Sequence, residues 1–131
     1  MLEYVFIYVL GALGYGSIEL LWRGNTHWTM LLTGGACFLM IHLIGTRLRV
    51  PFPLKPLLCA AAVTLTELLV GLLVNRALGW EVWDYSALPC NLAGQICLLY
   101  SLYWLGLSLP MLGLSRLLYR GLFAPELSSL P

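Results

Sequence analysis

The sequence predicts an all-α, polytopic integral membrane protein, with four transmembrane helices in a bundle and both termini in the cytoplasm. Of the 131 residues, 60% are hydrophobic and only 10% are charged, whereas a soluble domain has about 25% charged residues. The apolar residues also gather into four runs. Each run provides the roughly 20 residues that a helix needs to cross a hydrocarbon core about 30 Å thick. We therefore expect a single transmembrane domain.

Charged residues, prolines and glycines separate these runs. The first run begins almost at residue 1 and has neither the basic start nor the cleavage site of a signal peptide, so we expect it to be retained. The last run is too long for one crossing and contains Pro110, which we expect to kink or end the helix. The predicted spans are residues 2–22, 28–46, 57–74 and 89–110, followed by an interfacial helix over residues 111–120.

The basic residues predict the orientation. One side of the predicted topology holds most of them, namely Arg47, Arg49, Lys55, Arg116 and Arg120, and the other side holds Arg23 and Arg76. The excess of lysine and arginine on cytoplasmic loops then places both termini inside. An aromatic belt is expected near the outer boundary, where four tryptophans fall: Trp22, Trp28, Trp80 and Trp83.

Several function classes lack their sequence signals. A formal net charge of +1 offers no basic surface to nucleic acid. The cysteines have no CxxC spacing, so we interpret them as small buried residues rather than metal ligands or a redox pair; they are Cys37, Cys59, Cys90 and Cys97. No Walker A pattern is present, so we do not expect the chain itself to hydrolyse ATP. No cofactor or metal site is predicted.

Polar residues converge on the outer half of the predicted bundle. Glu67 lies about 18 Å along its helix from Lys55, which marks the inner edge. Because a carboxylate that faces lipid costs roughly 2.5–3.5 kcal/mol, we expect the acidic side chains to point inward, with Glu67 protonated or paired. The residues expected to form this polar pocket are Glu67, Glu19, Asn91, Gln95 and Asp84, with Asn91 and Gln95 at i, i+4 at the start of the fourth helix.

Each of these residues also has a structural interpretation. Glu19 fits an ordinary ion pair with Arg23 equally well. Glu67 has no cation within one turn of its own helix, and we favour a functional role for it over a packing role. Asn91 and Gln95 fit hydrogen bonds between helices equally well. His42, which lies away from this group, is interpreted as a hydrogen-bonded histidine between helices.

Several motifs in the second half of the chain resemble those of a known family. Thr64, Glu67 and Gly71 fit T-x-x-E-x-x-x-G, residues 83–86 read W-D-Y-S, and residues 91–104 fit N-x-x-G-x-I-C-L-x-x-S-x-x-W. In these motifs the chain resembles the bacterial membrane family labelled putative ABC-transporter type IV permease. In the first half, residues 14–19 and Arg23-Gly24 fit the family's glycine–glutamate and R-G elements, whereas residues 26–35 replace its usual G-P-x-x-P-I-Y-G segment.

The resemblance implies membrane transport in a bacterial cytoplasmic membrane. Four helices are few for a complete permease, so it also implies a homodimer or a partner membrane or ATPase subunit. Within the W-D-Y-S motif we expect Asp84 to cap the fourth helix and to hold Trp83 and Tyr85 at the headgroup level. Asn91 would then face Glu67 across a pocket that suits a cation, a protonated amine or a lipid headgroup. The alternative is a rigid clasp that only fixes this hairpin.

Three function classes remain open. The first is a transport subunit in which Glu67, with or without Glu19, binds a small cationic or amphiphilic substrate or a coupling proton. The second is a non-catalytic subunit that anchors or assembles a larger complex. The third, an enzyme acting on lipid, is the least favoured, because the histidines and glutamates that could pair are expected at different depths. We therefore predict that the chain is not an enzyme.

Overall fold

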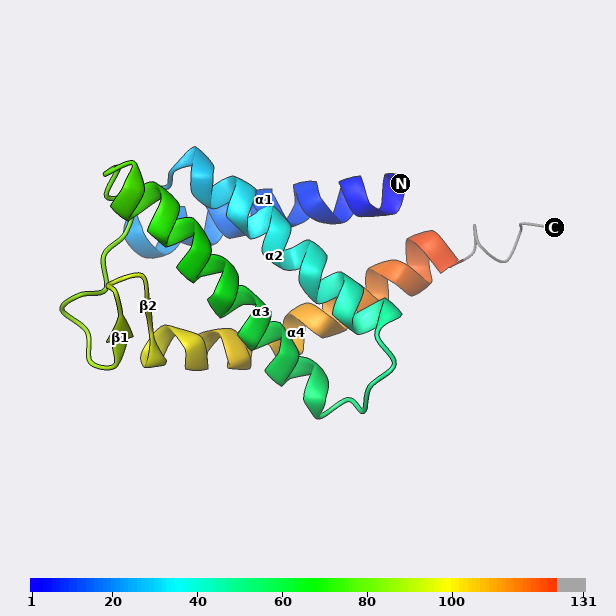
Figure 1. The fold of residues 1–131 in the computed structure, drawn as a ribbon. Helices are drawn as coiled ribbons and strands as arrows, with labels where there is room; N and C mark the ends of the chain where they lie inside the picture. Colours follow the sequence, from blue (N-terminus) through cyan, green and yellow to red (C-terminus); the bar gives the residue numbers. More distant parts are fainter. Residues whose placement is uncertain (125–131) are drawn as a thin grey trace.

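The computed structural model describes residues 1–124 as a bundle of four long helices with one small hairpin (Figure 1). In chain order the elements are α1 (Leu2–Arg23), α2 (Trp28–Arg47), α3 (Leu54–Gly71), the π-helical turn η1 (Leu72–Ala77), β1 (Asn91–Leu92), β2 (Ile96–Cys97), α4 (Leu98–Leu118) and the π-helical turn η2 (Tyr119–Phe123). Each of the four helices is long and apolar enough to cross a membrane. The predicted all-α class with four membrane-spanning helices is confirmed.

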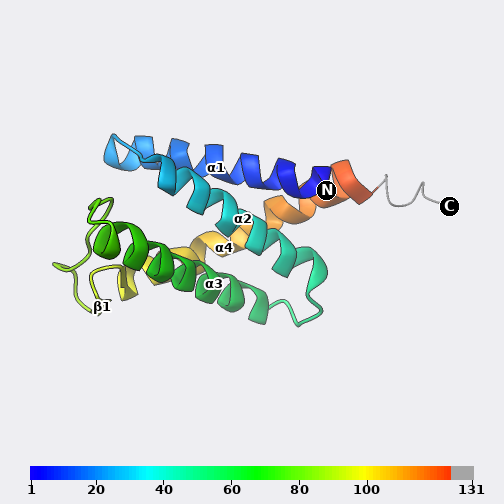
Figure 2. The same cartoon turned by 45° about the horizontal axis from the view of Figure 1, so that its top comes forward.

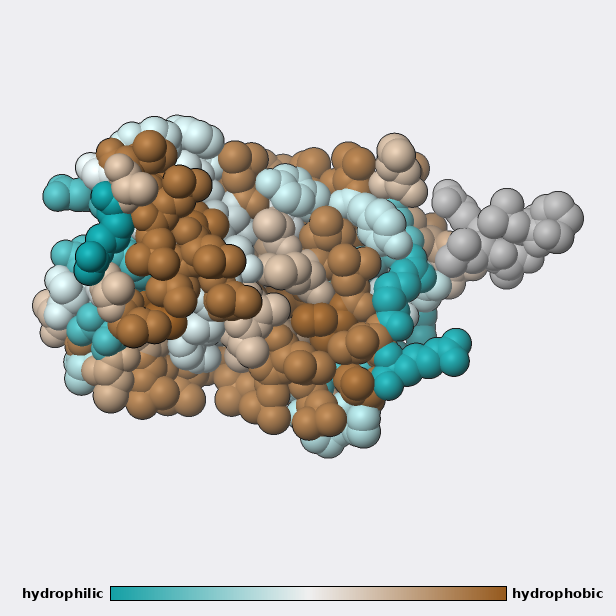
Figure 3. Space-filling model, viewed as in Figure 1, coloured by the Kyte–Doolittle hydropathy of each residue, from teal (hydrophilic) through white to brown (hydrophobic). Residues whose placement is uncertain are grey.

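The surface of the bundle matches a bilayer environment. Figure 3 shows a broad hydrophobic band over the middle of the molecule, with hydrophilic residues gathered at its two ends. Many large apolar side chains of the helices are exposed, among them Leu13 on α1 and Leu65 on α3. Such exposure would be costly in water, and in lipid it is the expected state of an outward helix face.

The fourth helix differs from the prediction at both ends. It begins at Leu98 rather than near residue 89, because residues 91–97 fold back as an antiparallel hairpin. Positive φ angles at Ala93 (56°) and Gly94 (72°) form the turn of this hairpin and are incompatible with a right-handed helix. The helix then continues through Pro110 to Leu118, without a break between the predicted span and residues 111–118. Membrane helices tolerate an internal proline in this way.

Helices α1 and α2 pack closely, and glycines make this contact possible. A Cβ atom on Gly11 would lie 2.5 Å from the Phe38 Cβ and 3.0 Å from the backbone oxygen of Gly34. A Cβ atom on Gly35 would lie 2.8 Å from the backbone oxygen of Tyr8. These helices therefore touch backbone to backbone, as small residues allow in membranes.

The hydrophobic core lies in the middle of the bundle and contains side chains from all four helices. Its buried members are Ile7, Cys37, Phe38, Ile41, Cys59, Val63 and Leu112. Cys97 is buried as well, so three of the four cysteines fit the prediction of small buried residues, whereas Cys90 is exposed.

Helices α1 and α4 are arranged like the arms of a V. They meet where α1 begins and α4 ends (Figure 2). There the ring of Phe6 packs edge to face at 5.8 Å on the ring of Phe123 in η2, the turn that follows α4. They diverge toward the β1–β2 hairpin. We call the meeting point the apex end of the bundle and the opposite end the hairpin end.

The glycine contact between α1 and α2 generates a prediction for stability. We expect Gly11→Ala to lower the free energy of unfolding by about 1–3 kcal/mol, because the added methyl group collides with backbone atoms that cannot move aside. Gly14→Ala is the matched control, since a Cβ atom there meets nothing within 4 Å and alanine favours the helix. Unfolding by denaturing detergent in mixed micelles measures both. Equal stabilities of the two variants would contradict the close approach.

Candidate functional site

Glu67 is a buried carboxylate near the hairpin end of the bundle. It projects from α3 and is only 5% exposed. Trp104 of α4 donates a hydrogen bond from its indole nitrogen to Glu67 Oε1 at 3.0 Å. Among the described residues, this is the one side-chain partner of the carboxylate, and no lysine or arginine contacts it. Glu67 is therefore held in place but not neutralised by a neighbouring cation.

Glu19 is buried too, but its surroundings differ. Arg23 donates to Glu19 Oε2 at 3.3 Å, one helical turn away, and the hydroxyl of Tyr15 donates to Oε1 at 3.0 Å. Arg23 also donates to the backbone oxygen of Val82 in the loop before the hairpin, at 3.2 Å. The predicted ion pair is therefore present, and it ties the end of α1 to that loop.

Aromatic stacking brings the two carboxylates together. The rings of Tyr15 and Trp104 stack with centroids 5.9 Å apart and planes within 15°. Since Tyr15 donates to Glu19 and Trp104 donates to Glu67, one continuous contact path joins both acids across the gap between α1 and α4.

A cavity of about 990 Å³ opens between α1 and α4, where the arms of the V diverge. Glu67 and Glu19 both line it, with Arg23. The rest of its wall is largely aromatic and aliphatic: Tyr15, Ile18, Trp22, Trp83, Tyr85, Leu88, Tyr100, Leu102, Tyr103, Trp104 and Leu107 are among the lining residues. This combination of one apolar chamber and a few convergent polar groups is typical of a ligand pocket.

The predicted positions of Asn91 and Gln95 are wrong. Asn91 lies on β1, where its side chain donates to the backbone oxygen of Leu88 at 2.8 Å and accepts from the Gly94 N–H at 3.1 Å. It does not face Glu67. Gln95, 4% exposed, accepts from Asn75 at 2.8 Å. Both line a second, smaller cavity of about 610 Å³ beside the hairpin.

Asp84 also has a role different from the one predicted. It does not cap α4, because the residue before that helix is Cys97 and no side chain caps it. Instead, Asp84 Oδ1 accepts the backbone N–H of Ser86 at 2.9 Å and holds a tight turn. This hydrogen bond lowers the pKa of the exposed Asp84 carboxyl.

Trp83 and Tyr85 fix the loop against the bundle. Trp83 is buried, and its indole nitrogen donates to the backbone oxygen of Gln95 at 2.9 Å. The Tyr85 backbone N–H donates to the oxygen of Gly94 at 2.7 Å, and its ring stacks on Tyr100 at 4.7 Å. Burial raises the pKa of the Tyr85 hydroxyl well above its ordinary value, so the ring borders the pocket as a neutral group.

Asn75 is the residue that sequence reasoning missed. Its Oδ1 accepts the backbone N–H groups of Val82 at 2.7 Å and Trp83 at 3.3 Å, and its amide donates to Gln95. It therefore joins η1, the turn that follows α3, to both the loop and the hairpin. We call Asn75 together with residues 82–95 the clasp. The alternative of a rigid clasp describes Asn91 and Gln95 better than a shared pocket with Glu67, whereas Asp84 both holds a turn of the clasp and lines the pocket with Glu67.

Comparison with known protein families gives a match over nearly the whole chain. The model of the family described as "Putative ABC-transporter type IV" matches residues 3–124. The chain belongs to this family. Comparison with curated proteins and with solved structures finds no match. Family membership and the four apolar helices identify a multi-pass membrane protein related to transport.

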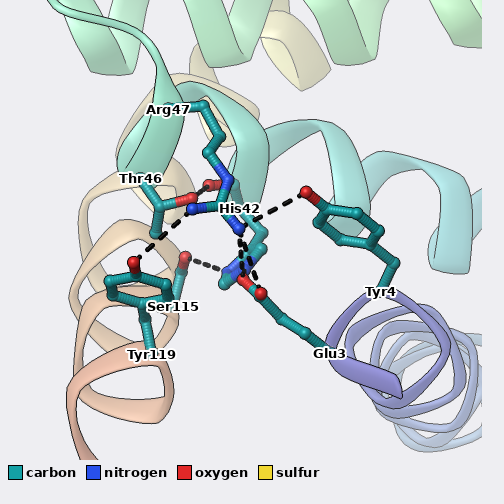
Figure 4. Close-up of polar contacts among 7 residues, drawn as sticks. All are labelled: Glu3, Tyr4, His42, Thr46, Arg47, Ser115 and Tyr119. Carbon is teal, nitrogen blue, oxygen red and sulfur yellow. Dashed lines mark hydrogen bonds and ion pairs between the residues drawn. The ribbon is translucent and has the colours of Figure 1, made fainter. Parts of the chain in front are cut away.

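A second polar group in this type IV family member lies at the apex end. His42 accepts or donates on both ring nitrogens, with Ser115 Oγ at 2.7 Å from Nδ1 and Glu3 Oε1 at 2.6 Å from Nε2 (Figure 4). This confirms the predicted interhelical histidine. It overturns the expectation that histidine and glutamate lie at different depths.

The apex group resembles an acid–base–hydroxyl chain, but its burial argues against nucleophilic catalysis. Both His42 and Ser115 are 0% exposed, and neither of the two cavities described above reaches them. A nucleophile has to meet its substrate within bonding distance. Over residues 1–124 we also find no group of three or more histidine, cysteine, aspartate or glutamate side chains placed to hold a metal ion.

The clasp generates a prediction for local stability in this family member. We expect Asn75→Leu to speed amide hydrogen exchange of Val82 and Trp83 by about 10- to 100-fold, because it removes hydrogen bonds worth about 0.5–1.5 kcal/mol each. The neighbouring Arg76→Leu is the control, since Arg76 makes one long contact of 3.5 Å to Ala93. Exchange in lipid nanodiscs measures both variants. Unchanged protection in Asn75→Leu would show that other contacts hold the clasp.

Proposed function

We propose that this protein is a membrane transport subunit that binds a monovalent, lipophilic organic cation in the pocket between α1 and α4. The observation that carries the proposal is Glu67, a buried carboxylate in an aromatic pocket with a tryptophan donor and no cationic partner among the described residues. A buried charge is costly unless it is paired. A positively charged ligand would supply the missing partner.

The charges of the pocket favour a ligand with a single positive charge. Of the three acidic residues in its lining, Glu19 is already balanced by Arg23. Asp84 is solvated at the rim, where it holds the turn at Ser86. Glu67 is left as the one acid in the lining whose charge a ligand would balance. A divalent ligand would bring one charge more than the pocket compensates.

The chemistry of the wall favours an organic cation over a metal ion. Aromatic faces attract ammonium-type cations and are the usual recognition element for quaternary ammonium groups. Tyr85, Tyr100 and Trp104 line the same pocket as Glu67, where Tyr85 stacks on Tyr100 and Trp104 donates to Glu67. Metal ions such as Ca²⁺ need six or more oxygen ligands, whereas the wall here is mostly carbon.

The position of the pocket suits an amphiphilic ligand that enters from the bilayer. Exposed apolar side chains border its opening on both arms of the V, with Trp22 on α1 and Leu102 on α4. A ligand could thus keep apolar substituents in contact with lipid or with the wall while its charge moves to Glu67. Binding rather than catalysis is the role we propose.

The remaining parts of the proposal concern assembly and location. Since we expect no ATP hydrolysis from this chain, we propose that it works with an ATPase subunit or a second copy of itself. We place it in the bacterial cytoplasmic membrane with both termini inside, following the distribution of basic residues. The alternative is an anchoring or assembly subunit, in which Glu67 only joins α3 to α4 through Trp104.

Ligand binding by Glu67→Gln tests the proposed function. Glutamine keeps an oxygen that accepts from Trp104, so the variant removes the charge and preserves the fold. We expect tetraphenylphosphonium, a lipophilic monovalent cation, to bind the wild type in nanodiscs at least about tenfold more tightly than the variant, as loss of a desolvated charge pair predicts. Isothermal titration calorimetry gives both dissociation constants.

Two further measurements sharpen this test. Glu81→Gln removes one acid from the loop without touching the pocket between α1 and α4, and should bind like the wild type. Native mass spectrometry of the wild type and Glu67→Gln measures the number of subunits in each assembly. It also detects any small molecule that only the wild type retains. If the wild type and Glu67→Gln bind equally and are equally assembled, the transport proposal fails and the assembly subunit becomes the better explanation.

A further inference from the structure

The smaller cavity of about 610 Å³ beside the β1–β2 hairpin has a lining unlike that of the pocket between α1 and α4. We call it the hairpin cavity. Among the described residues, Trp83 is the one aromatic side chain in its lining, and most of the others are polar or charged, including Asn75 and Gln95. It lies at the hydrophilic hairpin end of the bundle (Figure 3), where a membrane protein meets lipid headgroups. A ligand suited to this cavity is therefore polar and lies at the membrane surface.

Three charged side chains line the hairpin cavity without pairing with one another. Arg76 lies on η1, whereas Glu81 and Asp84 lie in the loop before the hairpin. In the part of the chain that the structure describes, no ion pair joins Arg76 to either acid. The one hydrogen bond of Arg76 is the long contact of 3.5 Å to the backbone oxygen of Ala93. The cavity thus presents a cation from η1 and two carboxylates from the loop, all three available to a ligand.

These charges favour a ligand that carries both signs of charge. The hydrogen bond from the Ser86 N–H lowers the pKa of the exposed Asp84 carboxyl, so this acid is ionised at neutral pH. Since the acids outnumber Arg76, a ligand with negative charge alone is repelled. Over residues 1–124 no group of three or more metal-ligating side chains is present. A phosphate paired with Arg76, joined to an ammonium group paired with the two acids, satisfies all three charges.

The lining also favours one kind of ammonium group. A primary ammonium has three N–H donors, and carboxylate oxygens accept such charge-assisted hydrogen bonds. A quaternary ammonium has no N–H and is bound instead by a cage of aromatic faces. The hairpin cavity offers Trp83 as its one aromatic residue in the described lining, and that side chain is buried. A primary ammonium therefore fits Glu81 and Asp84 better than a choline group does.

An exposed apolar stripe leads along α3 to Arg76. Leu65, Leu69, Leu72 and Arg76 follow one another at spacings of four, three and four residues, so they lie on one face of α3 and η1. The three leucines are 57%, 60% and 39% exposed. From Leu65 to Leu72 the helix rises roughly 10 Å, which covers most of the roughly 15 Å hydrocarbon depth of one leaflet. An acyl chain can lie on this leucine stripe while its phosphate reaches Arg76.

We propose that the hairpin cavity binds a phospholipid whose headgroup carries a primary ammonium group, as in phosphatidylethanolamine. Arg76 donates to the phosphate, Glu81 and Asp84 accept from the ammonium, and an acyl chain covers the leucine stripe of α3. The bound lipid joins η1 to the loop before the hairpin at the membrane surface. This site involves neither Glu67 nor the cation of the proposed function.

Lipid competition measured by native mass spectrometry tests the inference. The full-length protein, freed of lipid in detergent, is mixed with equal amounts of phosphatidylethanolamine, phosphatidylcholine and phosphatidylglycerol that have the same acyl chains. The adducts of each lipid are then counted. We expect at least about threefold more adducts with phosphatidylethanolamine than with either competitor, because a hydrogen bond to a charged group is lost with the other two.

Three variants locate the site. Arg76→Gln should reduce the binding of phosphatidylethanolamine and phosphatidylcholine alike, because both carry the same phosphate. Glu81→Gln should reduce the preference for phosphatidylethanolamine over phosphatidylcholine by about twofold or more, because it removes one acceptor of the ammonium. Arg49→Gln is the matched control, since it removes the same charge from the loop between α2 and α3, at the other end of α3. It should bind like the wild type.

The inference is overturned if the wild type binds the three lipids equally. It is also overturned if Arg76→Gln leaves lipid binding unchanged, or if Glu81→Gln leaves the preference unchanged. Glycerophosphoethanolamine, which has the headgroup without acyl chains, should not displace the lipid at equal concentration, and displacement would overturn the assignment to a lipid. Glu67→Gln should keep the lipid preference, so a failure of cation binding and a failure of this inference are distinguishable.

Discussion

A carboxylate inside a bilayer has to meet a hydrogen-bond donor, a cation or a cavity, and this requirement governs how the four helices lie together. Glu3 meets His42 and Arg47, and so the start of α1 is held beside α2 and the end of α4. Glu19 meets Arg23 and Tyr15, and so the other end of α1 reaches the loop before the hairpin. The acids thus act as fixed points between helices whose apolar surfaces alone would pack in many ways.

Glu67 satisfies the same requirement in a different manner. Trp104 supplies a donor, and the rest of its surroundings is the pocket between the arms of the V. The family signature is divided between two tasks in this protein. Its glutamate and its final tryptophan, Glu67 and Trp104, meet in the pocket wall, whereas the W-D-Y-S segment and Asn91 build the clasp that closes the hairpin end.

Hydrophobicity and length were sufficient to predict the class, the number of helices and, to within one residue, the limits of α1 and α2, whereas α3 begins and ends three residues earlier than expected. They failed after residue 89, because the turn of the hairpin depends on the φ angles of Ala93 and Gly94, which no hydrophobic pattern records. The burial of Glu67 and Glu19 followed from depth along each helix. The partners of His42 did not, because Glu3 and Ser115 lie 39 and 73 residues away in the chain.

The exposed Cys90 has a practical consequence. The other three cysteines, Cys37, Cys59 and Cys97, are buried, so the natural chain carries a single thiol open to solvent, and it lies in the loop at the hairpin end. A thiol reagent that does not cross membranes, added to intact and then to opened vesicles, would react with that one position from one side alone. Labelling of Cys90 would therefore report on which side of the membrane the hairpin end lies, and no residue has to be substituted for the experiment.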